Sequence, residues 1–160
     1  MKKCFPPIID RNSEVLILGS FPGEESLRKK QYYGHPQNQF WRIIGEITCE
    51  NLNGLEYPEK KKALLKHRIA LWDVISSCER PGSLDSSIRN ERMNNLGKIH
   101  RLAPNIRLIV FNGKKAGKYT HEFKGYRTKV LPSTSPAYTL KYEKKLKEWK
   151  AAVGEWTKTR

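Results

Sequence analysis

Short, mostly apolar runs at wide intervals constrain the fold of this chain more than any other feature. Val15–Leu18, Ile69–Ile75 and Leu108–Phe111 do not alternate regularly between apolar and polar residues. Strands with this continuous pattern lie in parallel sheets that helices cover on both faces. Segments with helical periodicity separate the runs, as parallel strands require. The pattern therefore predicts an α/β fold.

The expected elements alternate along the chain. The predicted strands are Glu14–Gly19, Ile69–Ile75, Arg107–Phe111 and Arg127–Leu131. The predicted helices are Asn38–Glu50, Pro58–Lys66, Glu91–Leu102, Lys114–Glu122 and Leu140–Trp156. A long loop is expected up to Pro36, and a polar loop from Ser76 to Ser87. In the closing helix, Leu146, Trp149, Val153 and Trp156 recur at spacings of three and four, which indicates a buried stripe.

The length of 160 residues suits one domain, 1–160, with no repeat or linker. No apolar run approaches the roughly 20 residues of a membrane span, so no membrane association is expected. No signal peptide is visible either, which favours a cytoplasmic protein. Cys4, Cys49 and Cys78 are isolated and lack metal-ligand spacing, so we interpret them as reduced structural thiols, with a catalytic cysteine as the alternative.

The chain carries 31 basic and 16 acidic residues, a formal net charge of +15. From Gly113 to Arg160, 13 basic residues stand against four acidic ones. Binding to a polyanion such as nucleic acid is the natural inference, because neutralising phosphates releases counterions. A lysine-rich solvated surface is the alternative.

Polar or glycine-rich loops follow all four predicted strands. They are Ser20–Gly23, the segment after Asp73, Asn112–Gly113 and Ser133–Ala137. Ligands of open parallel sheets bind outside the carboxyl ends of the strands. The four loops should therefore meet at one edge and form a site.

The turn after the first predicted strand and the long loop before Pro36 suggest how a flat polar ring would be held. Gly19 and Gly23 bound a turn whose backbone amides can donate to an anion or a carbonyl oxygen. Tyr33 can stack on a nucleobase, and Phe21 is a second candidate for stacking. The alternatives are an ordinary turn and loop aromatics that pack on the core.

Two polar side chains are candidates for contact with a base. Asn38 lies where a loop becomes a helix, so it either caps the helix or contacts a water or a flipped nucleotide. Asp73, near the end of a buried strand, needs a partner. It either accepts an N–H from a base or caps the next loop.

The segment Ser133-Thr134-Ser135-Pro136-Ala137 precedes the most basic helix. Its hydroxyls and amides can grip a phosphate while Ala137 or Tyr138 pushes into a duplex. The alternative is a plain polar turn in which Thr139 caps the helix.

At these residues the chain resembles the uracil-DNA glycosylase superfamily, and within it the hypoxanthine-DNA (deoxyinosine) glycosylase branch. The motifs that carry the resemblance are Gly19–Gly23, Tyr32-Tyr33-Gly34-His35-Pro36-x-Asn38-x-Phe40-Trp41, Ala70–Val74 and Ser133–Ala137. The resemblance implies a three-layer α/β/α sandwich around a four-stranded parallel sheet. It also implies a monofunctional enzyme of base excision repair that flips a deaminated base and hydrolyses its N-glycosidic bond.

The resemblance also implies a set of site residues. Asn38 and Ser20 are expected to be catalytic. Phe21, Pro22, Gly23, Tyr33 and Asp73 are expected to bind the base, and Ser133, Thr134, Ser135, Pro136 and Ala137 to bind DNA. Damaged DNA is the expected partner of a monomer, and no cofactor, metal or iron–sulfur cluster is expected.

Two departures from the family pattern bear on the substrate. The first motif has no Asp or Asn to position water, and the last has no His to support a departing uracil. Efficient removal of uracil by the route of the classical uracil enzymes is therefore not expected. From the branch that it resembles, hypoxanthine is the favoured base, with uracil as a secondary substrate. The alternatives are a uracil or mismatch-specific glycosylase, a module that binds damaged DNA without cutting it, and a hydrolase of small nucleotides.

Overall fold

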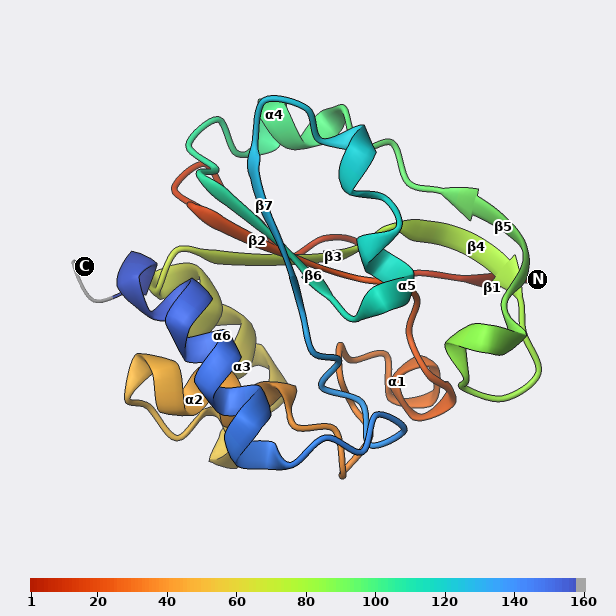
Figure 1. The fold of residues 1–160 in the computed structure, drawn as a ribbon, viewed down its shortest axis with the longest axis horizontal. Coiled ribbons are helices and arrows are strands. Elements are labelled where there is room, and N and C mark those ends of the chain that lie inside the picture. The colour runs from red at the N-terminus through yellow and green to blue at the C-terminus, as the bar shows by residue number, and fades with distance from the viewer. Residues whose placement is uncertain (158–160) are drawn as a thin grey trace.

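The structure is a computed structural model that describes residues 1–157, and a four-stranded parallel sheet lies at its centre. The strands are β2 (Val15–Gly19), β3 (Ile69–Asp73), β6 (Leu108–Asn112) and β7 (Arg127–Leu131). Their order across the sheet is β3-β2-β6-β7 (Figure 1). All four strands predicted from the sequence are present, and they run parallel as expected.

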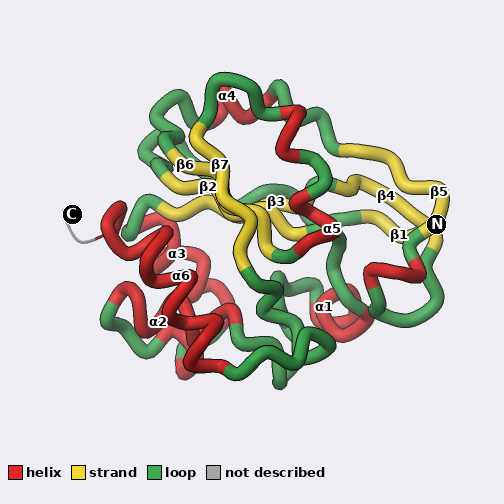
Figure 2. The backbone as a smooth tube through the Cα atoms, viewed as in Figure 1, coloured by secondary structure: helices red, strands yellow, loops and turns green. Residues whose placement is uncertain are grey.

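Helices cover both faces of this sheet (Figure 2). On one face lie α2 (Phe40–Thr48), α3 (Tyr57–Lys66) and α6 (Tyr142–Thr157), and on the other α4 (Lys98–Leu102) and α5 (Lys114–Gly117). Alternate residues of β2, β3 and β6 enter different cores: in β2, Val15 and Ile17 pack with α2, whereas Leu16 and Leu18 pack with Ile99 of α4. Both faces are apolar because both are covered, which confirms the three-layer α/β/α architecture.

The closing helix α6 buries the face that its sequence indicates. Trp149 and Val153 are fully buried, and Leu146 and Trp156 pack at the edge of the same core. Lys145 of α6 is also buried, which its charge did not indicate.

A second, antiparallel sheet extends from the end of β3. Its strands are β1 (Lys2–Lys3), β4 (Ile75–Glu79) and β5 (Arg89–Met93), in the order β1-β4-β5. The loop predicted over 76–87 was therefore wrong for residues 76–79, which belong to β4, and residues 85–87 form a 3-10 turn. The start of the helix predicted over 91–102 was also wrong, because residues 91–93 belong to β5. Strand β5 is held by its backbone and leaves nearly all of its side chains exposed, so it has no apolar pattern to detect.

Two other predicted segments differ in detail. The loop before Pro36 contains a short helix, α1 (Glu24–Lys29). The helix predicted over 114–122 ends at Gly117 and is followed by a 3-10 turn, Thr120–Glu122. A Cβ on Gly117 would come within 2.8 Å of Val130 on β7, so the helix and the strand approach closely at this glycine.

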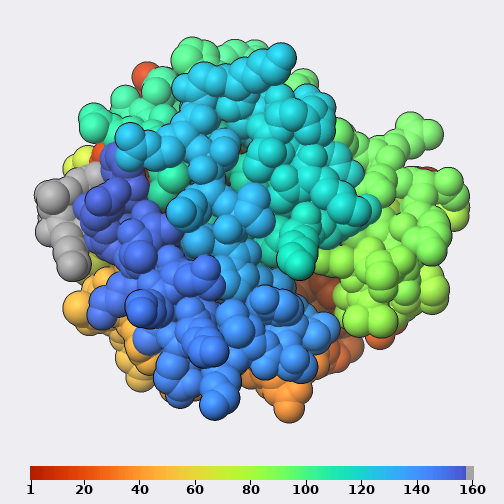
Figure 3. Space-filling model, in the orientation of Figure 1, coloured from red at the N-terminus to blue at the C-terminus, as the bar shows by residue number. Residues whose placement is uncertain are grey.

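The loops that leave the carboxyl ends of the central strands gather around α1 (Figure 1). In the space-filling view, the segment after β2 is recessed between the green β4–β5 region and the blue segment after β7 (Figure 3). None of the helices within residues 1–157 combines the length and the apolar surface that a bilayer crossing needs.

Candidate functional site

A cavity of about 850 Å³ lies at the carboxyl ends of the central strands. Sites for small molecules typically enclose roughly 300–1,000 Å³, so a nucleobase is within its capacity. The cavity is lined by all twelve residues predicted for the site: Ser20, Phe21, Pro22, Gly23, Tyr33, Asn38, Asp73, Ser133, Thr134, Ser135, Pro136 and Ala137. The fold thus brings the four predicted segments together, while the chemical role of each residue stays a prediction.

The ends of β2 and β3 pack closely together at the cavity wall. Gly19 and Asp73 are partners across the two strands. A Cβ on Gly19 would lie 2.6 Å from Asp73 Oδ1 and 3.0 Å from the Tyr33 hydroxyl oxygen. Only a glycine therefore allows the carboxyl group and the phenol to occupy their positions.

Asp73 is a buried carboxyl group with unused hydrogen-bonding capacity. It is 4% exposed, and its Oδ2 atom has no hydrogen-bond partner among residues 1–157. Burial raises the pKa of Asp73 to about 7, and the negative charge of Asp85 adds to the rise, while Arg80 opposes it. A large share of these carboxyl groups is therefore protonated near neutral pH.

The turn after β2 is tied to the loop between β4 and β5. Ser20 Oγ donates a hydrogen bond to Asp85 Oδ1 at 2.7 Å, and the Glu24 N–H donates to Ser83 Oγ at 2.8 Å. Arg80 donates to the carbonyl oxygen of Pro22. The β4–β5 loop therefore supports the turn that carries four of the predicted site residues.

The Tyr33 ring is half-buried and lies against the core. It stacks on Phe40 with the ring centroids 4.2 Å apart and the planes inclined by 21°. Its φ of 53° lies in the left-handed region, which is uncommon for a tyrosine. Burial and the Asp73 charge raise the pKa of the Tyr33 hydroxyl, so that group stays protonated.

Asn38 lines the cavity and also supports the start of α2. Its Oδ1 accepts a hydrogen bond from the Phe40 N–H at 2.9 Å. The N-cap of α2 is Gln39, so Asn38 stands one residue before the cap position considered as its alternative role. Its bond to the first helical N–H coexists with a place on the cavity wall. Because Oδ1 is engaged, the Nδ2 amino group is the end of the amide left to donate to a ligand.

Asn112 connects the end of β6 to the loop that follows β7. Its Nδ2 donates to Thr134 Oγ1 and its Oδ1 accepts from the Thr134 N–H, both at 3.0 Å. Within the same loop, Ser133 and Ser135 hydroxyls accept the N–H groups of Ser135 and Ala137 at 3.1 Å. Residues 136–138 are exposed at the rim, so this loop is fixed at its base and open at its tip.

Sequence reasoning missed three residues that build this site. Asp85 lines the cavity, while Arg80 and Lys145 support its loops from behind. Asn112 was named with Gly113 as a loop of the site but was given no role of its own. Arg80 and Asp85 lie in a segment without periodicity, and Lys145 resembles the exposed lysines around it.

No metal or thiol chemistry is indicated at the site. Across residues 1–157, no three His, Cys, Asp or Glu side chains are grouped as a metal site requires. All three cysteines are free and none of them lines the cavity, so the alternative of a catalytic cysteine has no support here.

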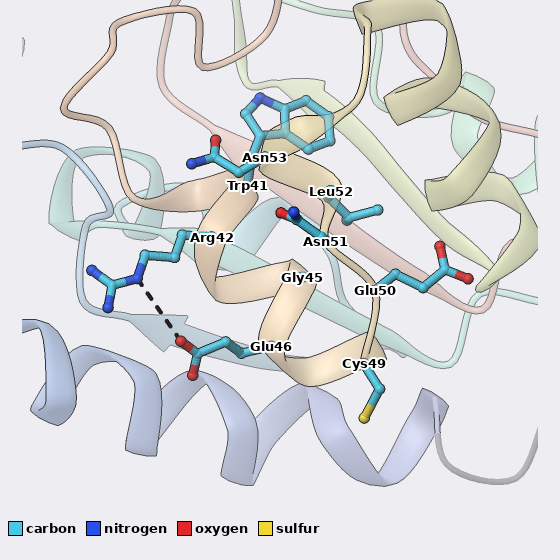
Figure 4. A pocket seen from close by; sticks show the side chains of 9 residues that line it. All are labelled: Trp41, Arg42, Gly45, Glu46, Cys49, Glu50, Asn51, Leu52 and Asn53. Atoms are coloured by element: carbon cyan, nitrogen blue, oxygen red, sulfur yellow. Dashed lines mark ion pairs between the residues drawn. The ribbon is translucent and has the colours of Figure 1, made fainter.

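A second, smaller hollow of about 460 Å³ surrounds the end of α2 (Figure 4). Its lining residues are Trp41, Arg42, Gly45, Glu46, Cys49, Glu50, Asn51, Leu52 and Asn53. Arg42 and Glu46 form an ion pair at 3.8 Å along the helix. The hollow contains none of the predicted site residues, and we assign it no chemistry.

Comparisons with known proteins show the family to which the chain belongs. The model of a family described as the uracil DNA glycosylase superfamily matches residues 6–157. Relatives from Methanosarcina acetivorans and Methanosarcina barkeri, each named hypoxanthine DNA glycosylase, are 46% and 44% identical over 153 residues. These matches cover 94% of this chain and 97% of each relative.

A solved structure shows the same fold. It is a solution NMR structure from Methanosarcina acetivorans, described as a candidate uracil DNA glycosylase, with a TM-score of 0.89 and 45% identity. The similarity covers 97% of this chain and 98% of that one.

Proposed function

Because the chain belongs to the uracil DNA glycosylase superfamily, we propose that it is a monofunctional DNA glycosylase that excises hypoxanthine from deoxyinosine in DNA. The observation that carries this proposal is the buried Asp73 carboxyl group, which faces a cavity large enough for a base and has one unpartnered oxygen. The names of the Methanosarcina relatives support the choice of hypoxanthine.

A neutral Asp73 carboxyl group is complementary to the edge of hypoxanthine. Hypoxanthine presents an N1–H donor beside the O6 acceptor. The carbonyl oxygen of a protonated carboxyl group accepts the first, and its O–H donates to the second. Adenine presents an acceptor at N1 and an amino group at C6, so it reverses both positions, and a carboxyl group can pair with it only with the proton on its other oxygen.

The reaction is the hydrolysis of one bond. A water oxygen bonds to C1′ of the deoxyribose while the C1′–N9 bond breaks and its electron pair leaves with the base. The base departs as an anion and takes up a proton, and the water loses one to the solvent. A neutral Asp73 that donates to O6 stabilises the charge that develops on the base, whereas an ionised one repels it.

Asn38 is assigned to the departing base. Its Oδ1 accepts from Phe40, and its Nδ2 can offer N–H donors to acceptor atoms of the purine. Because a neutral amide is not a base, Asn38 does not take a proton from water. The Ser20 hydroxyl donates its hydrogen bond to Asp85, so the lone pairs of its oxygen can accept from a water or from an N–H of the base.

The remaining walls have simpler roles. The Tyr33 ring is held in place by its stacking on Phe40, so the flipped base can pack against a rigid aromatic surface. The loop 133–137 holds the DNA backbone, and the net charge of +15 draws the duplex to the enzyme.

A panel of duplexes tests the function. Each carries hypoxanthine, uracil, xanthine or adenine at one position, and alkali converts every abasic site into a strand break. We expect hypoxanthine to be released fastest and adenine not at all. Fastest release of uracil would support the main alternative, a uracil glycosylase, which the description of the NMR structure favours. No break with any base would leave a DNA-binding module without activity.

A further inference from the structure

Lys145 is a buried cation behind the loop 133–138. Only 1% of its surface is exposed, and burial lowers the pKa of its amino group. Its Nζ donates to the carbonyl oxygen of Ser135 at 3.2 Å and lies 5.4 Å from the centroid of the Tyr138 ring. The residue stands in the first turn of α6, where the helix dipole also disfavours a positive charge.

Arg80 is a buried cation behind the turn that follows β2. It is 3% exposed and donates to the carbonyl oxygens of Pro22 and of Gly82. Its Cζ lies 5.4 Å from the centroid of the Phe21 ring. Its Nη1 is buried and has no hydrogen-bond partner among residues 1–157.

The two cations share an arrangement that is costly for folding. Each holds a carbonyl oxygen of one cavity loop and lies near the aromatic ring of a residue in or beside that loop. Within residues 1–157, neither forms an ion pair with a carboxylate. A buried charge without a counter-ion destabilises a fold, and an apolar side chain of similar volume is often better tolerated.

We propose that Arg80 and Lys145 are positioning residues that fix the two loops through their carbonyl groups and keep a positive charge behind each one. This inference rests on the proposed function, because the anions that the two charges would stabilise are the departing base and a phosphate of DNA. Behind the turn 20–23, the charge of Arg80 favours the departing base anion. Behind the loop 133–138, the charge of Lys145 favours a backbone phosphate seated on that loop.

The test removes each charge at nearly constant volume in the full chain. The variants are Arg80→Met and Lys145→Met, with Arg80→Lys and Lys145→Arg as variants that keep the charge. The controls are Arg101→Met and Lys98→Met, two exposed side chains of α4 that do not line the cavity. For each protein, we would measure the single-turnover rate on a deoxyinosine duplex at saturation, the affinity for duplex over a salt series, and the midpoint of thermal unfolding.

The two losses should differ in kind. Lys145→Met should bind duplex roughly tenfold more weakly, and its affinity should fall less steeply with salt, by about one released counterion. Its saturated rate should be almost unchanged. Arg80→Met should keep its affinity and lose roughly tenfold or more in saturated rate. Lys145→Arg and Arg80→Lys should recover part of each loss. The thermal midpoint of Lys145→Met should equal or exceed that of the wild type.

Three results would overturn the inference. In the first, the methionine variants match the α4 controls in affinity, salt dependence and rate. In the second, the charge-retaining variants are no better than the methionine variants. In the third, Arg80→Met unfolds and Arg80→Lys does not rescue it, which would make the guanidinium purely structural. If the wild type released no base, that result would contradict the proposed function. The affinity of Lys145→Met for undamaged duplex would still test the role of the Lys145 charge.

Discussion

Gly19 lies so close to Asp73 that a single methyl group on its Cα would come within 2.6 Å of the carboxyl oxygen Oδ1. The two residues are paired across β2 and β3, so neither backbone can move away without disturbing the sheet. The position of the Asp73 carboxyl group in the cavity therefore depends on the absence of a Cβ atom at Gly19.

Gly19→Ala should displace Asp73 and inactivate the enzyme. A misplacement of about 1 Å can cost roughly 100-fold in rate, and overpacking costs about 1–3 kcal/mol of stability. The single-turnover rate on a deoxyinosine duplex and the free energy of unfolding measure the two effects. Gly154→Ala in α6 is the control, because its Cβ meets only an ordinary contact at 3.6 Å. A wild-type rate in Gly19→Ala would contradict the role of Asp73.

Excision of hypoxanthine should slow as the pH rises through about 7, because Asp73 then loses the proton it donates to O6. In Asp73→Asn the amide presents the same acceptor and donor without titrating. This variant should stay active and lack the decline near pH 7, whereas Asp73→Ala should lose both hydrogen bonds and most activity. Single-turnover rates between pH 5 and pH 9 provide the comparison. An inactive Asp73→Asn with an unchanged profile would require a different role for this carboxyl group.

Asp73 should also make stability depend on pH. Its pKa rises from 3.8 to about 7 on folding, so between these values the folded state binds more protons than the unfolded chain. Stability from this group is therefore greatest at low pH and falls as the pH rises through that window. The stability difference between Asp73→Asn and the wild type should grow in favour of the variant from pH 4 to pH 7 and stay constant above pH 7. Its total growth should be ~1.4 kcal/mol for each unit of the pKa shift. Urea unfolding at several pH values measures the gap, and parallel curves would refute the assignment.

Asp85→Asn should move the alkaline decline in rate to lower pH. The negative charge of Asp85 helps to raise the pKa of Asp73, so its removal lets Asp73 ionise earlier. The amide oxygen can still accept the Ser20 hydroxyl, so the turn after β2 should stay in place. The measurement is the pH–rate profile of the variant beside that of the wild type. A midpoint that stays or moves upward would show that the two carboxyl groups are not coupled.

Asn38→Ala should lower the saturated rate by roughly 100-fold to 1,000-fold, the usual cost of removing one donor to a developing anion. It should also cost about 1 kcal/mol of stability, because the Phe40 N–H loses its acceptor. Asn38→Ser separates the two roles, since a serine hydroxyl can still accept from that N–H. We expect the serine variant to be stable and slow. A fast serine variant would mean that Asn38 only caps the helix.

The sequence was sufficient to predict the central sheet, and the reason is physical. Strands such as β2 and β6 are buried on both faces, so every residue from Val15 to Leu18 had to be apolar. The family resemblance identified from short motifs is confirmed by the match over residues 6–157. The convergence of twelve predicted residues on one cavity follows from the polarity of parallel strands.

The β4–β5 region could not be predicted in the same way. Its strand β5 is stabilised by backbone pairing with exposed side chains, and a sequence does not record such pairing. Asp85 meets Ser20 across 65 positions of the chain, and no local pattern links the two. Lys145 has the same residue type as its solvated neighbours, so only the packing of α6 distinguishes it.

Val74 is the single residue between the end of β3 and the start of β4. The Val74 N–H donates a hydrogen bond to the carbonyl oxygen of Gly19, and the Val74 carbonyl oxygen accepts one from the Asn94 N–H. The Asn94 side-chain amide donates to the carbonyl oxygen of Asp73. No flexible linker therefore separates the second, antiparallel sheet from the Asp73 carboxyl group. A duplex that pressed on the outer edge of this sheet would also shift the carboxyl group that we propose contacts the base. Substitutions along β5 should therefore alter base selectivity without touching the base.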